Sequence, residues 1–206
     1  YKVAATSRNL QRLTENVGQE LNDQFLPLEV DLLNDDSVKH GVEATVSKFG
    51  TIDVLVNNAG HGFRGALEET SIEEGHKLFE DNFFSMHRVL LQVLPIMREH
   101  RNGLIYNISS IGALLSLPLS AYYAATKAAV ISISECLAAE VEEYNIKVVP
   151  VEPGPFQTNF FQPTNLLPPQ HELPAYDGVR ERRNKSAIGN QQKKDGDPER
   201  AAKVFI

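Results

Sequence analysis

Five short apolar runs alternate with helix-like stretches along most of this chain, and this order constrains its fold more than any other feature. The strand-like runs cover residues 2–7, 25–30, 52–56, 103–109 and 146–154, the last one ending in a turn. Apolar residues at helical spacing lie between them, in residues 10–21, 35–50, 71–98 and 121–144. The third run, IDVLV, is a near-continuous apolar run, as expected for a parallel strand covered on both faces. The alternation predicts an α/β fold with a doubly wound parallel sheet in three α/β/α layers.

Polar residues or glycines follow every strand-like run. The carboxyl ends of parallel strands meet at one edge of a sheet, and ligands bind there. Each residue alone could be an ordinary turn residue, but packing does not explain their gathering at one edge. We therefore expect a binding site that includes Ser7, Arg8, Asp31, Asn57, Asn58, Ala59, Gly60, Ser109, Ser110, Pro153, Gly154 and Thr158.

The sequence YAATK, from Tyr123 to Lys127, suggests proton-transfer chemistry. Tyr123 and Lys127 are four residues apart in a stretch that favours a helix, so they share one helix face. A phenol titrates near ~10, and a nearby ammonium lowers the pKa of such a group toward neutral pH. By chance alone, roughly half of chains this long would contain such a pair, as a half-buried Tyr and a solvated Lys.

A serine hydroxyl is expected to hold the substrate oxygen beside Tyr123. Ser109 and Ser110 are both candidates, and strand alternation turns only one of them to the inner face. Tyr122 has no lysine four residues later, so we interpret it as structural.

Composition limits the classes of partner. The length of 206 residues fits one domain, with a Pro-rich and polar stretch at 155–198 that we expect to be a functional or mobile loop. A net charge of −7 argues against nucleic acid or an anionic membrane surface. The single cysteine, Cys136, is expected to be a small core residue and favours a reducing, cytoplasmic location. The histidines lack metal-ligand spacing, so no metal is expected and we interpret them as surface or packing residues.

Together, the motifs resemble those of the short-chain dehydrogenase/reductase family, in order and spacing. The matching pieces are NNAG (57–60), Asn82, NISS (107–110), YAATK (123–127) and PGPFQT (153–158). The resemblance implies a Rossmann-like fold and a catalytic set of Ser110, Tyr123, Lys127 and Asn82. The spacing to Tyr123 selects Ser110 over Ser109. The resemblance also implies a homodimer or homotetramer, and a dinucleotide site formed by Ser7, Arg8, Asp31, Leu32, Asn58, Ala59, Gly60, Tyr123, Lys127, Pro153, Gly154 and Thr158.

The glycine-rich turn that cradles the pyrophosphate in this family, TGxxxGxG, does not occur in this sequence. Gly60, Gly62 and Gly65 match GxGxxG, but no helix is expected to open on Gly65, because the capping box comes later at Ser71 and Glu74. Either the sequence is a piece of a longer protein or the protein is naturally shortened, and we expect the first. Loss of the family's first strand would leave unpaired backbone groups in the sheet.

The expected function is interconversion of an alcohol and a carbonyl by hydride transfer with NADP(H). The cofactor prediction rests on the tip of the first run, where an acidic residue would select NAD and an Arg would accommodate the 2′-phosphate of NADP. Ser7 and Arg8 stand there, while Asp31 ends the next run; the alternative is that Arg8 is merely solvated. Apolar residues after PGP predict a lid over an apolar substrate or, alternatively, plain packing: Phe156, Phe160, Phe161, Leu166 and Leu167. The competing hypothesis is a non-catalytic, dinucleotide-sensing or scaffold protein.

Overall fold

The computed structural model describes residues 1–17, 22–191 and 196–205. The chain forms two compact units. The first consists of Tyr1–Asn57, Phe84–Tyr106 and Glu135–Val149, and the second of Asn58–Phe83, Asn107–Ser134 and Pro150–Ile206. The single domain expected from the length stays a prediction.

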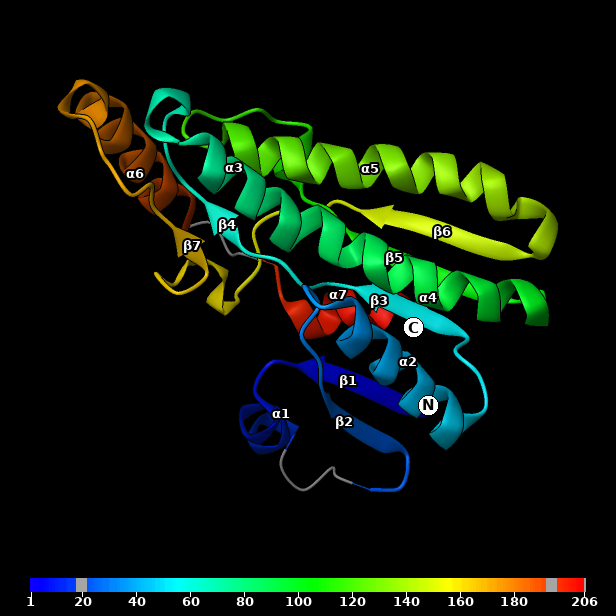
Figure 1. Cartoon of the computed structure of the whole chain (residues 1–206). Helices are drawn as coiled ribbons and strands as arrows, with labels where there is room; N and C mark the ends of the chain where they lie inside the picture. The colour runs from blue at the N-terminus through cyan, green and yellow to red at the C-terminus, as the bar shows by residue number, and fades with distance from the viewer. Residues whose placement is uncertain (18–21, 192–195, 206) are drawn as a thin grey trace. The chain divides into compact units, whose positions relative to one another are not determined.

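Five strands begin in the first unit, and they form two sheets. β1 (Val3–Ser7) and β2 (Phe25–Glu29) pair in parallel, from Val3 opposite Phe25 to Ser7 opposite Glu29 (Figure 1). α1 (Leu10–Val17) contacts both strands, and residues 18–21 of the helix predicted here lie outside the described residues. The other strands follow the order β3-β5-β6: β3 (Val54–Asn57), β5 (Gly103–Ile108) and β6 (Ile146–Val151). The predicted α/β class with parallel strands is confirmed.

The described strands β1-β2 and β3-β5-β6 form two separate sheets. The prediction that the third strand is covered on both faces is wrong. Val54 is 46% exposed and Val56 is 56% exposed. Val54 and Val56 alternate with the partly buried Leu55 and Asn57, so the exposed side chains share one face of β3, which the described residues leave largely uncovered. Among the described strands, β3 pairs with β5 alone.

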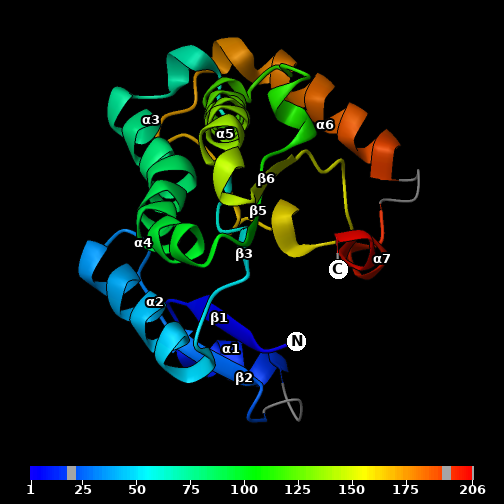
Figure 2. The ribbon, with the colours of Figure 1, turned by 90° about the vertical axis from the view of Figure 1, so that its right-hand side faces the viewer.

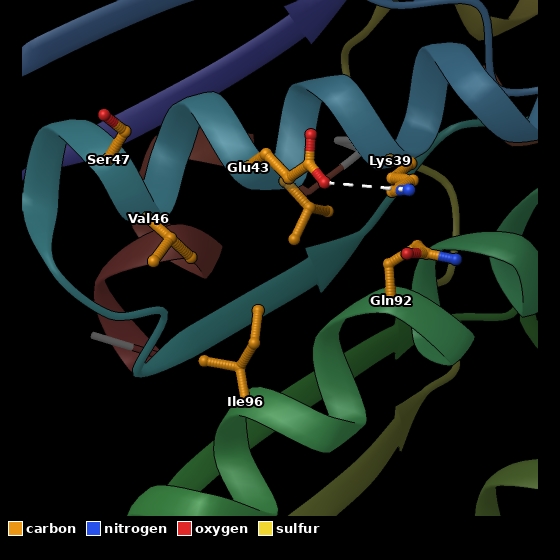
Figure 3. Close-up of a pocket in the computed structure, with 7 residues that line it drawn as sticks. Lys39, Glu43, Val46, Ser47, Gln92 and Ile96 are labelled. Carbon is orange, nitrogen blue, oxygen red and sulfur yellow. Dashed lines mark ion pairs between the residues drawn. The ribbon is translucent and has the colours of Figure 1, made fainter.

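Helices α2 (Asp35–Phe49) and α4 (Ser85–His100) pack side by side in the first unit (Figure 2). The Asn34 side chain caps the start of α2, and Gly50 ends it in the left-handed region at φ 90°. Arg88 of α4 donates a 2.8 Å hydrogen bond to Asp35. A pocket of about 390 Å³ opens between the two helices and holds no residue of the predicted site (Figure 3); it is lined by Lys39, Val42, Glu43, Val46, Ser47, Gln92 and Ile96.

In the second unit, α3 (Ile72–Phe79) begins at the predicted capping box. The Ser71 hydroxyl accepts from Glu74 N, and the Glu74 carboxylate accepts from Ser71 N. The helix predicted over 71–98 is not continuous, however. A π-helical turn, Glu80–Phe84, separates α3 from α4, and Asn82 lies inside it. Such turns widen a helix locally and are frequent at functional sites.

Where the sequence predicts a loop over 155–198, the described residues form short turns, a strand and helices. Residues 192–195 lie outside the described part of the chain. β7 (Leu166–Leu167) pairs in parallel with β4 (Gly62–Phe63). Short turns occupy Asn159–Phe161 and Pro174–Tyr176, and they are followed by α6 (Asp177–Gln191) and α7 (Pro198–Phe205). The sequence of α6, DGVRERRNKSAIGNQ, has almost no apolar stripe, so helical periodicity could not reveal it.

Cys136 does not occupy the predicted core position. It is exposed on α5 (Ala121–Val141), next to the exposed Glu135. The buried stripe of that helix passes instead through Thr126, Val130 and Ser134, at helical spacing.

Candidate active site

The hydroxyls of Ser110 and Tyr123 are hydrogen-bonded to each other in the second unit. Ser110 follows β5 and caps the short turn Ile111–Ala113, where its Oγ accepts from Gly112 N at 3.0 Å. Tyr123 lies in the first turns of α5. Burial raises the pKa of Tyr123, and the hydrogen bond from Ser110 offsets this only in part. The phenol therefore keeps its proton at neutral pH.

The other candidate serine, Ser109, is bonded to the backbone of α5. Its buried hydroxyl donates a 2.7 Å bond to the backbone oxygen of Lys127, so it ties β5 to α5. The structural interpretation of Tyr122 also fits, because its ring packs on Gly75 of α3: a Cβ there would lie 2.2 Å from Tyr122 Cε1.

Lys127 is 5% exposed, which contradicts the alternative of a solvated lysine. Its Nζ donates a 2.9 Å hydrogen bond to Ile108 O. Burial lowers the pKa of Lys127 to about 8. Burial disfavours the charged form of Lys127, and burial is also the largest effect on the pKa of Tyr123. The expected lowering of the Tyr123 pKa by Lys127 is therefore not found in this structure.

Asn82 is a central residue of the site, not an incidental helix residue. Its side chain is 2% exposed and binds the backbone of His61 on both sides: Oδ1 accepts from His61 N and Nδ2 donates to His61 O, each at 2.9 Å. Nδ2 also lies 3.3 Å from Thr126 Oγ1 on α5. The π-helical turn thus joins the loop after β3 to the helix that carries Tyr123.

Gly60 brings the NNAG loop next to the buried lysine. A Cβ at this position would lie 2.9 Å from Asn82 Oδ1 and 3.4 Å from Lys127 Nζ, so a side chain would displace one of them. GxGxxG does not open a helix here. Gly62 belongs to β4, Gly65 N bonds Leu119 O, and α3 starts only after Ser71.

Of the cofactor residues that the sequence predicted, those at the first two strand tips lie in the first unit. Val30 N donates to Ser7 O at 3.0 Å, so the tips of β1 and β2 adjoin. Ser7 Oγ accepts from Asn9 N, and an Asp31 oxygen accepts from Leu33 N. The second unit holds the remaining members: Asn58, Ala59, Gly60, Tyr123, Lys127, Pro153, Gly154 and Thr158. There Pro153 O accepts from Ile111 N at 3.0 Å, which ties PGP to the Ser110 turn.

Aromatic side chains after PGP lie against Tyr123. The ring of Phe160 has its centroid 5.8 Å from that of Tyr123, and Phe161 meets Phe160 edge-on at 5.4 Å. On the other side, a Cβ at Gly62 would lie 2.6 Å from Leu166 Cδ1 and 2.9 Å from Phe160 Cζ. Phe160, one residue of the predicted lid, therefore lies next to Tyr123.

Three members of the site were missed by sequence reasoning. Gly112 lies beside both hydroxyls, since a Cβ there would be 3.3 Å from Ser110 Oγ and 3.5 Å from Tyr123 Cε1. His61 and Asp81 form a 3.0 Å contact between the imidazole Nε2 and a carboxylate oxygen. His61 follows Gly60 and Asp81 precedes Asn82, but the two residues are far apart in the sequence, so sequence reasoning did not pair them.

Two further features were tested over the described part of the chain. No described helix has the length and apolar character of a membrane span. The described residues also contain no cluster of three or more His, Cys, Asp or Glu side chains placed to hold a metal ion.

Known proteins share this sequence and geometry. The family model for short chain dehydrogenases matches residues 1–166. A 3-ketodihydrosphingosine reductase from Bacteroides thetaiotaomicron is 43% identical over 164 residues, which are 80% of this chain and 58% of the relative. The chain thus spans less than two thirds of that relative's length.

Solved structures agree with the sequence matches. A short-chain dehydrogenase from Streptomyces avermitilis superposes with a TM-score of 0.86 at 36% identity, over 99% of this chain and 73% of that one. A 3-ketoacyl-(acyl-carrier-protein) reductase from Brucella melitensis, complexed with NADH, gives 0.72 at 29% identity over 82% and 75%. ElxO with NADP bound gives 0.74 at 32% identity over 79% and 66%. With the Ser110–Tyr123 contact, the buried Lys127 and a family match over most of its length, this chain belongs to the short-chain dehydrogenase family.

Proposed function

We propose that the protein carrying this chain is an NADP(H)-dependent oxidoreductase that interconverts an alcohol and a carbonyl on an apolar substrate. The observation that carries the proposal is the hydrogen-bonded pair of Ser110 and Tyr123, with a buried Lys127 on the same helix as Tyr123. Burial disfavours a charged ammonium. A non-catalytic scaffold would have no need to bury the Lys127 ammonium next to Gly60.

The residues of the second unit fit the nicotinamide end of a dinucleotide. Gly60 leaves a space that a Cβ would fill, directly beside Lys127 Nζ. Among the described residues, Ile108 O is the acceptor for that ammonium, which has three donors, so donors remain for ribose hydroxyls. A bound nicotinamide would supply the hydride.

The side chains of this chain would hold the reacting oxygen and move its proton. Ser110 Oγ and Tyr123 Oη, already hydrogen-bonded to each other, would both bond the carbonyl oxygen of the substrate. Tyr123 would then donate its phenolic proton to that oxygen. Because burial raises the pKa of Tyr123, the donor is present at neutral pH, which favours the reduction direction. Lys127 would bind the ribose and restore the phenolic proton.

The apolar substrate is supported by the aromatic residues over Tyr123. Phe160, Phe161 and Leu166 give this side of the site an apolar surface. The 3-ketodihydrosphingosine reductase in the comparison bears the name of a long-chain ketone, and we propose a substrate of this class. NADP is favoured by Ser7 and Arg8 at the tip of β1. The predicted lid motion, cytoplasmic location and homodimeric or homotetrameric state remain proposals.

The test is reduction of a panel of carbonyl compounds by the whole protein, followed as NADPH oxidation. Tyr123→Phe removes the proton donor and keeps the ring, so turnover should fall roughly 10²-fold or more while NADPH binding is retained. Tyr122→Phe is the matched control and should keep its turnover. Near-native turnover in Tyr123→Phe, or no turnover of any carbonyl by the wild type, would contradict the proposal.

A further inference from the structure

The imidazole of His61 lies between two oxygens that can only accept hydrogen bonds. Its Nδ1 is 3.1 Å from Gly62 O, and its Nε2 is 3.0 Å from Asp81 Oδ2. Nε2 faces a carboxylate, so it is the ring nitrogen placed to donate, and the ring is held between the two oxygens.

The partner of His61 is an ionised carboxylate. Lys77 of α3 places its Nζ 3.2 Å from the same Asp81 oxygen. Burial raises the pKa of Asp81, but the hydrogen bonds and charges of His61 and Lys77 outweigh it and hold that pKa below its usual value. The charged groups around the His61 ring are therefore Asp81 and Lys77, and Lys127 lies beside the preceding residue, Gly60.

The contact adds a third bond to a junction that the catalytic geometry depends on. The Asn82 side chain already bonds the backbone N and O of His61, and the neighbouring Asp81 bonds the His61 ring. Residue 61 is thus fixed to two consecutive residues of the π-helical turn. Gly60, one residue earlier, is the part of this loop that packs against Lys127 Nζ and Asn82 Oδ1. A shift of the loop would move both groups.

We propose that His61 and Asp81 are positioning residues: their side-chain contact holds the Gly60 loop and Asn82 in the geometry that Lys127 requires. The inference rests on the proposed function for its effect on turnover. Neither residue needs to touch substrate or cofactor. Without the contact, residue 61 keeps its two backbone bonds to Asn82 but loses its bond to Asp81.

The first test compares kcat and KM in the whole protein. We expect His61→Gln to lower kcat roughly tenfold, with the KM of the carbonyl substrate little changed. Lost positioning lowers kcat, whereas a lost substrate contact would raise KM. An unchanged kcat, or a loss confined to KM, would overturn the proposal.

Variants of the partner and of the charge sharpen the test. Asp81→Asn should match His61→Gln, and the double variant should lose no more than either single one. His61→Arg keeps a donor to the Asp81 carboxylate and should restore part of the rate. Two controls remove a His or an Asp from the first unit and should leave kcat unchanged: His100→Gln, and Asp35→Asn, whose partner is Arg88. Additive losses in the double variant would count against the pair.

A second readout does not require turnover. The NMR signal of the proton on His61 Nε2 should be protected from exchange in the wild type and lost in Asp81→Asn, because the carboxylate that accepts it is gone. The same exchange in both proteins would refute the contact even if His61→Gln failed to fold. If the wild type reduces no carbonyl but the exchange differs, the proposed function fails and the contact stands.

Discussion

The ring of Phe160 lies 5.8 Å from the ring of Tyr123, with 52° between their planes. Phe160 therefore shields the phenol that the proposed mechanism uses, and it reaches Gly62 on the opposite side. The contact places an apolar side chain from the segment after β6 next to the Tyr123 ring. We therefore propose that Phe160 selects substrate size.

Phe160→Ala should reduce kcat/KM for a long-chain ketone about tenfold, because a Phe side chain contributes about 1.5–3 kcal/mol when it covers apolar surface. A short-chain ketone should lose less, since it reaches less of that surface. Phe161→Ala is the matched control: its ring is 45% exposed and meets Phe160 rather than Tyr123. Equal losses for long and short ketones would show that Phe160 does not select substrate size.

The buried Lys127 gives the fold a specific pH dependence. Its pKa is about 8 in the folded protein and 10.5 ordinarily, so between these values the unfolded chain binds more protons. Stability from this group therefore rises as pH increases from about 8 to 10.5. Relative to Lys127→Met, the wild type should gain up to about 3 kcal/mol of unfolding free energy across that window.

Urea unfolding of both proteins at several pH values between 7 and 10 measures this difference. Lys147→Met, which removes an exposed lysine on β6, is the control and should track the wild type throughout. Lys127→Met should also lose turnover while remaining folded. If the free-energy difference does not change with pH, the ammonium is not buried as the structure has it.

Glu69 bonds the segment that leads into α6, and its side chain has no exposed surface. Its carboxylate accepts from Ala66 N, Leu173 N and Arg180, and Arg180 of α6 also bonds Asp177 and Leu173 O. Arg180→Met should open this junction and increase proteolysis of residues 170–191 roughly tenfold, because cleavage follows the open population.

Lys185→Met is the control for this loss, since Lys185 pairs with Glu181 only at 4.0 Å on the exposed face of α6. The hydrogen bonds of Glu69 outweigh its burial and lower its pKa below the usual 4.5, so the stability it contributes is present above that pH and is lost as pH falls below it. Proteolysis of the wild type should therefore increase on acidification more than that of Arg180→Met. Equal proteolysis rates in the wild type, Arg180→Met and Lys185→Met would show that the Glu69–Arg180 contact does not hold this segment in place.

Local rules predicted the features that depend on neighbours in sequence. The Ser71 and Glu74 capping box, the Gly50 helix end and the distinction between Tyr122 and Tyr123 all follow from residues within four positions. Features set by distant contacts did not emerge. The π-helical turn at Asn82 depends on the His61 backbone, and α6 is a polar helix held through Arg180.

Burial was the other quantity that pattern alone could not supply. The apolar run of β3 predicted cover on both faces, but Val56 is 56% exposed because the described residues leave one face of the strand largely uncovered. The spacing of Tyr123 and Lys127 predicted a lowered phenol pKa, whereas the structure buries both groups and raises it. Spacing identifies which groups meet, and the surrounding atoms decide which protonation state is favoured.

The cofactor preference is tested at the tip of β1. Ser7 has no charge to repel a phosphate, and its backbone oxygen is fixed by Val30 N, so the tip is a defined position beside β2. Arg8 is exposed and can offer its guanidinium to a 2′-phosphate. Ser7→Asp should repel that phosphate and bond ribose hydroxyls instead, and Arg8→Ala should remove its counter-charge.

Each change should move the ratio of kcat/KM for NADPH to that for NADH toward NADH, by roughly tenfold or more. Arg12→Ala, one turn further along in α1, is the control and should leave the ratio unchanged. Asp31→Asn should affect both cofactors equally, because Asp31 follows β2 rather than β1 and has no part in selecting the phosphate. A wild type that prefers NADH, or a ratio that neither change moves, would show that this strand tip does not select NADP.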